Sequence, residues 1–189
     1  MGGTVDQSAE INEDKRIFES ALQEAKLGNS EAEFDVGLMY LTGDGIAKDA
    51  EQALSWLLKA ANHEVIDAQY NAALMYLTGD GIDANTEQAF VWMTKAALNN
   101  RVDAQYNLGL MYDKAHDADK SFAWLSKAAE QGHQLAQYHL GRMHLKGYGT
   151  EVNLVLALKW LSKSAEQGCL KAQAVIDFEF TDPATIFKA

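Results

Sequence analysis

The sequence predicts an all-α protein, an α-solenoid of antiparallel helix pairs, and three observations lead to that prediction. A phrase that begins with Ala and a Glu or Gln and ends in Met-Tyr or Met-His recurs four times. Each copy is followed by a phrase centred on Trp and rich in Ala, Leu and Lys, which are strong helix formers. Gly and Asn, which tolerate positive φ and end helices, separate the phrases. Because one helix pair cannot bury a core alone, such pairs stack on one another.

The first phrase of each repeat predicts the first helix of a pair. Its apolar residues recur at steps of three and four, as on a half-buried helix. Successive copies begin 36, 36 and 32 residues apart, so the third repeat is the short one, and it has lost the Gly-x-Gly turn that follows the phrase elsewhere. The four copies start at Ala32, Ala68, Ala104 and Ala136.

The second phrase predicts the second helix, with a lysine three residues after its tryptophan. Asn62, Asn99 and Gly132 follow these phrases and are expected to take the positive φ that ends a helix. The four tryptophans are Trp56, Trp92, Trp124 and Trp160.

The repeats define the domain organisation. We expect a flexible N-terminal segment over 1–14, a solenoid over 15–180 and a C-terminal tail over 181–189. The solenoid contains a half repeat at 15–31, full repeats at 32–67, 68–103, 104–135 and 136–171, and a closing helix at 172–180. The Asp182-Pro183 step stops the closing helix, because the residue before proline avoids the helical region.

Composition and charge exclude several classes of function. The 189 residues are 48% hydrophobic and carry 16 basic and 27 acidic side chains, a formal charge of −11. This balance disfavours binding to nucleic acid or to an anionic membrane, since both need clustered Lys and Arg. The one cysteine, Cys169, excludes an intrachain disulfide. A polar start without the features of a signal peptide leads us to expect a cytoplasmic protein.

The charge is unevenly distributed along the sequence. Residues 1–103 carry 18 acids and 7 bases, whereas residues 104–189 carry nine of each. The whole net charge therefore lies in the first 103 residues.

Motifs for catalysis or metal binding give no candidate. The sequence has no phosphate-binding loop, no His-Glu-x-x-His and no Gly-x-Ser-x-Gly. Asp113, His116, Asp117 and Asp119 cluster in the shortened third repeat, but without an EF-hand pattern a solvated loop is favoured. We therefore predict no catalytic residue, no metal and no cofactor, and a protein that is not an enzyme.

The combined pattern resembles a known family. Ala-x3-Leu-Gly-x2-Tyr, then Gly-x-Gly-Ile, then Ala-x2-Trp-Leu-x-Lys-Ala-Ala-Glu-x-Gly is similar to the Sel1-like repeat, a relative of the tetratricopeptide repeat, over about residues 15–180. The resemblance implies a right-handed solenoid and a non-enzymatic adaptor that binds other proteins. A cysteine-rich branch of the family is linked to β-lactams; since its cysteines are absent here, β-lactam binding or hydrolase activity is the least favoured function.

A helical wheel of the first phrase identifies a candidate binding surface. The fifth and ninth positions define the core face, and the third and seventh lie opposite. First helices line the concave side of helix-pair solenoids, so we expect the third and seventh positions to bind a protein or peptide partner. Alternatively, these side chains pack between neighbouring first helices. They are Phe34, Leu38, Tyr70, Leu74, Tyr106, Leu110, Tyr138 and Arg142.

The acidic half of the sequence predicts a partner of basic or mixed charge. Glu31, Asp67 and Asp103 would steer such a partner, and Asp67 and Asp103 can also act as helix N-caps. We expect a monomeric adaptor that contacts neither nucleic acid nor membrane. The alternative function is that of a bacterial immunity protein, which binds and neutralises one cognate secreted toxin.

Overall fold

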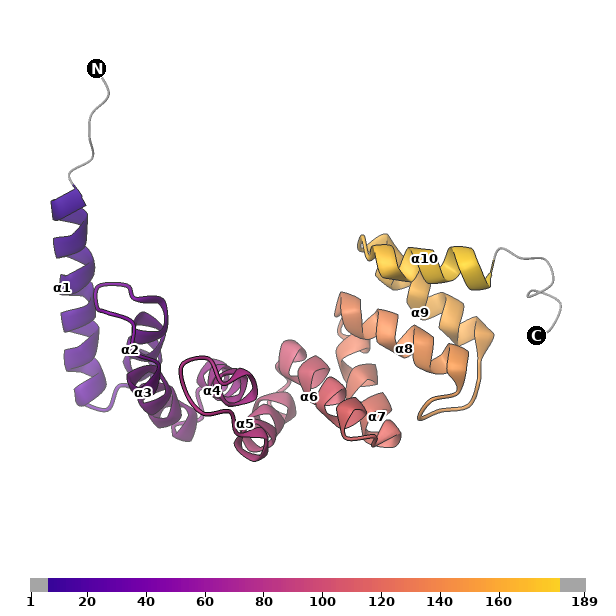
Figure 1. The fold of residues 1–189 in the computed structure, drawn as a ribbon, viewed down its shortest axis with the longest axis horizontal. Coiled ribbons are helices and arrows are strands. Elements are labelled where there is room, and N and C mark those ends of the chain that lie inside the picture. Colours follow the sequence, from indigo (N-terminus) through magenta and orange to yellow (C-terminus); the bar gives the residue numbers. More distant parts are fainter. Residues whose placement is uncertain (1–6, 181–189) are drawn as a thin grey trace, which may run out of the picture. The chain divides into compact units, whose positions relative to one another are not determined.

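The computed structural model describes the backbone of residues 7–180 and the side chains of residues 13–180. These residues form ten α-helices and no strand (Figure 1). Contacts divide the protein into two compact units. Unit 1 ends at Ala96 and unit 2 begins at Ala97. The predicted all-α class and the alternation of first and second helices are confirmed. None of the described helices is long and apolar enough to cross a membrane.

Unit 1, up to Ala96, is built around the first full repeat. α2 packs most extensively against α3, while α1 lies against α2 and α4 lies against α3. Phe18 of α1, Val36 of α2 and Trp56 of α3 are buried in one cluster. The helices are α1 (Gln7–Lys26), α2 (Ser30–Thr42), α3 (Ala50–Asn62), α4 (Ile66–Thr78) and α5 (Thr86–Leu98), whose last two residues belong to unit 2.

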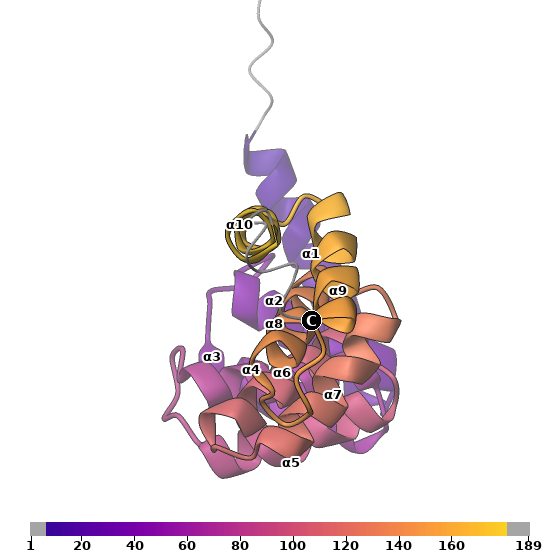
Figure 2. The ribbon, with the colours of Figure 1, turned by 90° about the vertical axis from the view of Figure 1, so that its right-hand side faces the viewer.

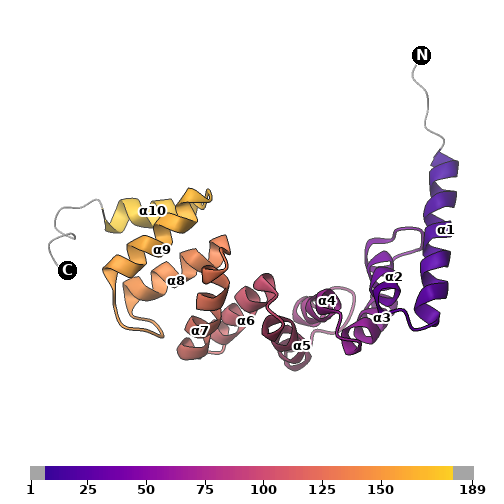
Figure 3. The same ribbon diagram turned by 180° about the vertical axis from the view of Figure 1, so that it is seen from behind.

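Unit 2, from Ala97 onward, repeats this arrangement. α6 pairs with α7 and α8 with α9, while α7 also packs on α8 and α10 closes the unit against α9 (Figure 2; Figure 3). Leu125, Leu140 and Met143 belong to its buried cluster. The helices are α6 (Val102–Lys114), α7 (Ala118–Glu130), α8 (Gln134–Lys146), α9 (Leu154–Glu166) and α10 (Leu170–Glu179).

The ends of the solenoid differ from the sequence-based boundaries. α1 begins at Gln7, inside the segment 1–14 for which flexibility is predicted. The closing helix α10 begins at Leu170, two residues before its predicted start. Residues 1–6 and the predicted tail, 181–189, lie outside the described residues.

Small residues let the two helices of a pair approach closely. A Cβ atom placed on Gly109 of α6 would lie 2.7 Å from Cγ of Leu125 on α7, and Gly141 of α8 meets Leu161 of α9 in the same way. The alanines that open the first phrase of each repeat are buried at 5% exposure or less. A lysine lies over the tryptophan ring of each second helix, with Nζ 3.5 to 4.8 Å from the ring centroid.

The positions of the helix N-termini show that the two predicted N-caps are wrong. Asp67 and Asp103 are not N-caps: each is the second residue of its helix, and the capping positions are held by Val65 and Arg101, neither of which caps with its side chain. A carboxylate is favoured there all the same, because it interacts with the positive end of the helix dipole.

The positive-φ positions after the second helices also differ from the prediction. They are Glu64 and Asn100 rather than Asn62 and Asn99, whereas Gly132 has the predicted positive φ. Each of the three lies two residues after the last residue of its helix. Gly43, Gly79 and Gly147 take the left-handed conformation after first helices.

Candidate functional site

The predicted binding residues of unit 1 lie on α2 and α4. Phe34 and Leu38 on α2 are half-buried, as are Tyr70 and Leu74 on α4. Of the predicted steering residues in this unit, Glu31 and Asp67 are exposed. The third and seventh positions of the first phrase therefore keep part of their surface open to a partner.

Tyr106 on α6, in unit 2, combines packing with exposure. Its ring stacks on the imidazole of His133, with centroids 4.3 Å apart and planes 24° apart, and lies 5.9 Å from the ring of His139. Tyr106 also packs against the buried cluster of unit 2. Part of the Tyr106 ring therefore packs against neighbouring helices, which is the alternative considered for these positions. The residue as a whole is half-buried, like Leu110 on the same helix.

Tyr138 and Arg142 occupy the same two positions on α8. Nη1 of Arg142 donates to the Tyr138 hydroxyl over 3.4 Å, and the guanidinium carbon lies 5.6 Å from the Tyr138 ring centroid. Tyr138 packs against the cluster formed by Leu161, Cys169 and Ala172. Asp103, the third steering residue, is exposed and lies 3.7 Å from both Arg101 and His133.

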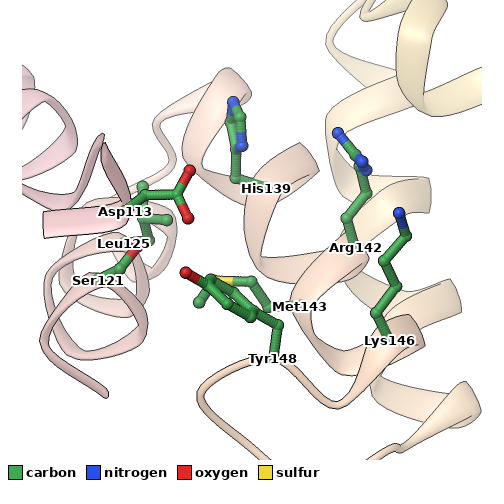
Figure 4. Close-up of a pocket in the computed structure, with 8 residues that line it drawn as sticks. All are labelled: Asp113, Ser121, Leu125, His139, Arg142, Met143, Lys146 and Tyr148. Atoms are coloured by element: carbon green, nitrogen blue, oxygen red, sulfur yellow. The ribbon is translucent and has the colours of Figure 1, made fainter. Parts of the chain in front are cut away.

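Arg142 also lines a pocket of about 120 Å³, which we call the α6–α8 pocket (Figure 4). Its residues come from the end of α6, the start of α7, one face of α8 and the loop that follows α8. This volume is well below the roughly 300–1,000 Å³ of a typical site for a drug-sized ligand, so the pocket fits a single chemical group. The lining residues are Asp113, Ser121, Leu125, His139, Arg142, Met143, Lys146 and Tyr148.

Local structure explains how the pocket is formed. His139, Arg142, Met143 and Lys146 follow a spacing of three, four and seven residues, which places them on one face of α8. The loop that carries Tyr148 is held by Gly149, which has a φ of +66° and lies so close to the Ala118 carbonyl at the start of α7 that a Cβ would clash.

Charge is distributed unequally around the pocket. Figure 4 shows Asp113 on one side and the side chains of Arg142 and Lys146 on the other. Arg142 and Lys146 form no ion pair with any residue that the structure describes. The pKa of Tyr148 is raised, first by burial and then by its hydrogen bond to Asp113 and the charges of Asp113 and Asp117.

His139 lies between these two sides of the α6–α8 pocket, and its imidazole is in the neutral form. Burial is the main reason that its pKa is lowered, and the positive charges of Arg142 and Lys171 lower it further, against the opposing effect of Asp113. At neutral pH the imidazole therefore provides one donor and one acceptor and does not add to the positive charge.

Ser121 contributes a buried hydroxyl to this pocket. The residue is 0% exposed, and its Oγ has no hydrogen-bond partner among the described residues. A buried hydroxyl without a partner is costly, and such groups are usually satisfied by a ligand or an ordered water when the protein offers nothing else.

Of the eight pocket residues, only Arg142 was predicted from the sequence to bind a partner. Other pocket residues could have been noticed in the sequence, because several of them differ from the residues at the equivalent positions of the other repeats. The apolar members follow the pattern: Met143 matches Met39, Met75 and Met111. The shortened loop, considered above as a metal site, contributes only Asp113. The described residues contain no group of three or more His, Cys, Asp or Glu side chains arranged to hold a metal ion.

Comparison with known proteins identifies the repeat. The family model described as the Sel1 repeat matches four segments, 30–64, 66–100, 102–133 and 134–169. Sel1 repeat proteins generally mediate protein–protein interaction and are typically non-enzymatic scaffolds. A search of the curated proteins gave no match.

Solved structures of similar proteins support the same assignment. One is c5321, a protective antigen of uropathogenic Escherichia coli with an SLR fold, at 34% identity over 86% of this chain and a TM-score of 0.81. Another is a Sel1 repeat protein from Oxalobacter formigenes, at 33% identity over 87% of this chain and a TM-score of 0.77. This chain spans 36% and 49% of the length of those two proteins.

A more distant structure shares only the fold. The immunity protein Pa5087 from Pseudomonas aeruginosa is 23% identical over 98% of this chain and 76% of its own, with a TM-score of 0.51. Four matched repeats over most of the described residues, together with two solved relatives above 30% identity, show that the chain belongs to the Sel1 repeat family.

Proposed function

We propose that this protein is a non-enzymatic adaptor that binds a protein or peptide partner through the third and seventh positions of the first phrase in each repeat. The observation that supports the proposal most directly is the recurrence, in all four repeats, of a half-buried aromatic ring at the third position. Half-buried rings fixed by their own packing give a partner apolar anchors that lose little side-chain entropy on binding.

The distribution of charge indicates the kind of partner. Residues 1–103 carry the entire net charge of −11, which favours a partner segment that is basic where it meets these repeats. Unit 2 adds the cations of the α6–α8 pocket, so a partner of mixed charge fits both parts of the protein.

A binding measurement with paired variants tests the proposal. A partner retained from the native cell is identified by mass spectrometry, and its dissociation constant is then measured by calorimetry. We expect Tyr70→Ala combined with Tyr106→Ala to abolish binding, with helix content by circular dichroism unchanged. Because Tyr106 also packs inside unit 2, the milder pair Leu74→Ala and Leu110→Ala provides a second test, for which we expect weaker binding.

Phe178→Ala is the matched control. Phe178 is an aromatic residue on α10 that is 81% exposed and lies outside the proposed surface, so its removal should leave the affinity unchanged. Wild-type affinity in a folded Tyr70 and Tyr106 double variant would contradict the proposed surface.

A narrower function, immunity to one secreted toxin, uses the same surface. The concentration of charge in one part of the sequence supports a single dedicated partner, since a strong local field accelerates the encounter with one oppositely charged protein. Co-expression distinguishes the two functions. Rescue of cell growth from one toxin, encoded beside this protein, would support immunity, whereas weak binding to many peptides would support a general adaptor.

A further inference from the structure

The four repeats allow each pocket residue to be compared with its equivalents in the same protein. Arg142 occupies the position that is Leu in the other three repeats, and Ser121 occupies a position that is otherwise Ala. Asp113 replaces Leu, and Tyr148 replaces the Asp of the Gly-Asp-Gly turns. The equivalents are Leu38, Leu74 and Leu110 for Arg142, and Ala53, Ala89 and Ala157 for Ser121.

These four departures come from three helices and a loop, yet they line one pocket. A solenoid repeats its pattern because each repeat makes the same contacts with its neighbours, so a position that only packs needs no new residue type. The apolar part of the pocket, Leu125 and Met143, keeps the repeat pattern. The departures therefore add polar chemistry to a pocket whose packing is otherwise ordinary.

The added groups favour an anion. Arg142 and Lys146 form no ion pair within the described residues, and the Ser121 hydroxyl is buried without a partner. The carboxylate of Asp113 is already engaged by the Tyr148 hydroxyl and lies on the opposite side of the pocket (Figure 4). Ser121 lies on the same side of the pocket as Asp113 (Figure 4). A carboxylate placed across the pocket can therefore accept a hydrogen bond from Ser121 and face the cations of Arg142 and Lys146 on the other side.

We propose that the α6–α8 pocket binds a single carboxylate, carried by an acidic side chain or by the C-terminus of a bound protein segment, with Arg142 and Lys146 as its cationic partners and Ser121 as a hydrogen-bond donor. The source of the carboxylate rests on the proposed function, that of a protein-binding adaptor. The pocket itself does not, because a small carboxylate can occupy it alone.

The test uses the full-length protein labelled with ¹⁵N and four small probes followed by NMR. N-acetylglycine represents the C-terminus of a polypeptide, and N-acetylglutamate α-methylamide represents an acidic side chain. Methyl phosphate represents another anion, and N-acetylglycine methylamide is uncharged. We expect saturable shifts of the Ser121, Arg142 and Tyr148 amides with the carboxylates, at affinities in the millimolar range expected for ligands of so few atoms. The carboxylate that binds more tightly identifies the source.

Variants that restore the repeat pattern provide the decisive comparison. Arg142→Leu should weaken carboxylate binding about tenfold or more, because a charge-assisted hydrogen bond is lost. Ser121→Ala should weaken it by a smaller factor. Both variants place in the pocket a residue that this protein already uses at the equivalent position, so both are expected to fold.

Lys159→Leu is the matched control, since it replaces an exposed cation of unit 2 that lies outside the pocket by the same residue, and it should bind the probes as the wild type does. Absence of saturable shifts, tighter binding of methyl phosphate than of either carboxylate, or unchanged affinity in Arg142→Leu would overturn the proposal. If the carboxylate probes bind as expected but the Tyr70 and Tyr106 double variant keeps wild-type affinity for its partner, the proposed function is contradicted and the carboxylate site is not.

Discussion

At the scale of single residues, the buried polar side chains carry information that the hydrophobic pattern does not. The second position of the first phrase is polar and buried in every repeat: Glu33, Gln69, Gln105 and Gln137 are 1 to 4% exposed. The three glutamines donate to a carbonyl eight residues earlier, at 3.1 to 3.3 Å, and so satisfy the end of the preceding second helix. In the first repeat Glu33 cannot donate and instead lies 2.8 Å from Nδ1 of His63.

Gln105 provides the first prediction. Its amide donates to the Ala97 carbonyl, and its oxygen accepts from Gln131 at 2.7 Å. Gln105→Ala removes both bonds, and the Ala97 residue that loses one of them is buried, so we expect the free energy of unfolding to fall by about 1–3 kcal/mol. Urea unfolding measures the change, with the exposed Gln88→Ala as the control. An equal loss in both variants would show that the buried bonds contribute nothing specific.

His144 provides a prediction about pH. It is 6% exposed, and its ring meets Phe122 edge-on at 5.4 Å, as Tyr40 meets Phe18 at 5.3 Å in unit 1. Burial lowers the pKa of His144 below its ordinary value of 6.5, against the opposing effect of a backbone hydrogen bond with Glu151. The unfolded polypeptide therefore binds a proton first as the pH falls. The contribution of the neutral His144 to the free energy of unfolding is therefore complete above about pH 6.5 and is lost as the pH falls toward the folded-state pKa.

His144→Tyr, which places the residue of the other three repeats there, removes this contribution. We expect the free energy of unfolding to decrease less between about pH 7 and pH 5 in the variant than in the wild type. Part of the dependence should remain, because the pKa values of His133 and His139 are also lowered by burial. Urea titrations at the two pH values give the comparison. A variant with an undiminished decrease would mean that His144 is not the source.

At the scale of helices, the contact between the two members of a pair depends on one small residue. Gly109 of α6 lies against Leu125 of α7, where an added Cβ would come within 2.7 Å of Cγ and 3.2 Å of the backbone nitrogen. The second repeat has Ala73 and Met93 at the corresponding places, both 0% exposed. A methionine side chain is more flexible than a leucine side chain, so Met93 can accommodate Ala73, which is larger than the glycine of the other repeats.

This comparison predicts a compensating pair of substitutions. Gly109→Ala alone should lower the free energy of unfolding by about 1–3 kcal/mol, because the closely packed pair has no room for a methyl group. Adding Leu125→Met should recover most of that loss. A double-mutant cycle in urea measures the coupling. Additive effects of the two substitutions would show that the close approach does not set the spacing of the pair.

At the scale of the whole molecule, the uneven charge predicts the kinetics of association. Glu31, Asp67 and Asp103 are exposed and belong to the part of the sequence that holds the net charge. Neutralising all three, as E31Q, D67N and D103N, should slow association with a basic partner up to about tenfold at low salt, and should make the rate less sensitive to ionic strength. Stopped-flow or surface plasmon resonance measures both quantities.

The control neutralises exposed acids elsewhere, as E130Q with E166Q in unit 2. Its association rate should stay close to that of the wild type. If the triple variant keeps the wild-type rate and salt dependence, the acidity serves solubility and not recognition.

The candidate site was predictable only in part. Recurrence at fixed spacing predicted Phe34, Tyr70 and Tyr106 as equivalent residues, and the structure places all three half-buried on first helices. The predicted caps Asp67 and Asp103 lie two residues after the actual capping positions, since a cap depends on where the backbone turns and not on residue type alone. Ser121 departs from the alanine of the equivalent positions, but that departure alone indicated no site, because a serine in a helix is unremarkable until its surroundings are known.

The sequence by itself determined the repeat, its helix pairs and the location of the net charge, because these depend on periodicity and composition along the polypeptide. The tertiary structure alone decided that Asp113, Ser121, Arg142 and Tyr148 line one pocket, and that the second-position glutamines are buried. Those facts depend on which faces of α6, α7 and α8 meet when the repeats pack, and on a loop held close to α7 by Gly149. Contacts between segments far apart in the sequence leave no mark on local periodicity.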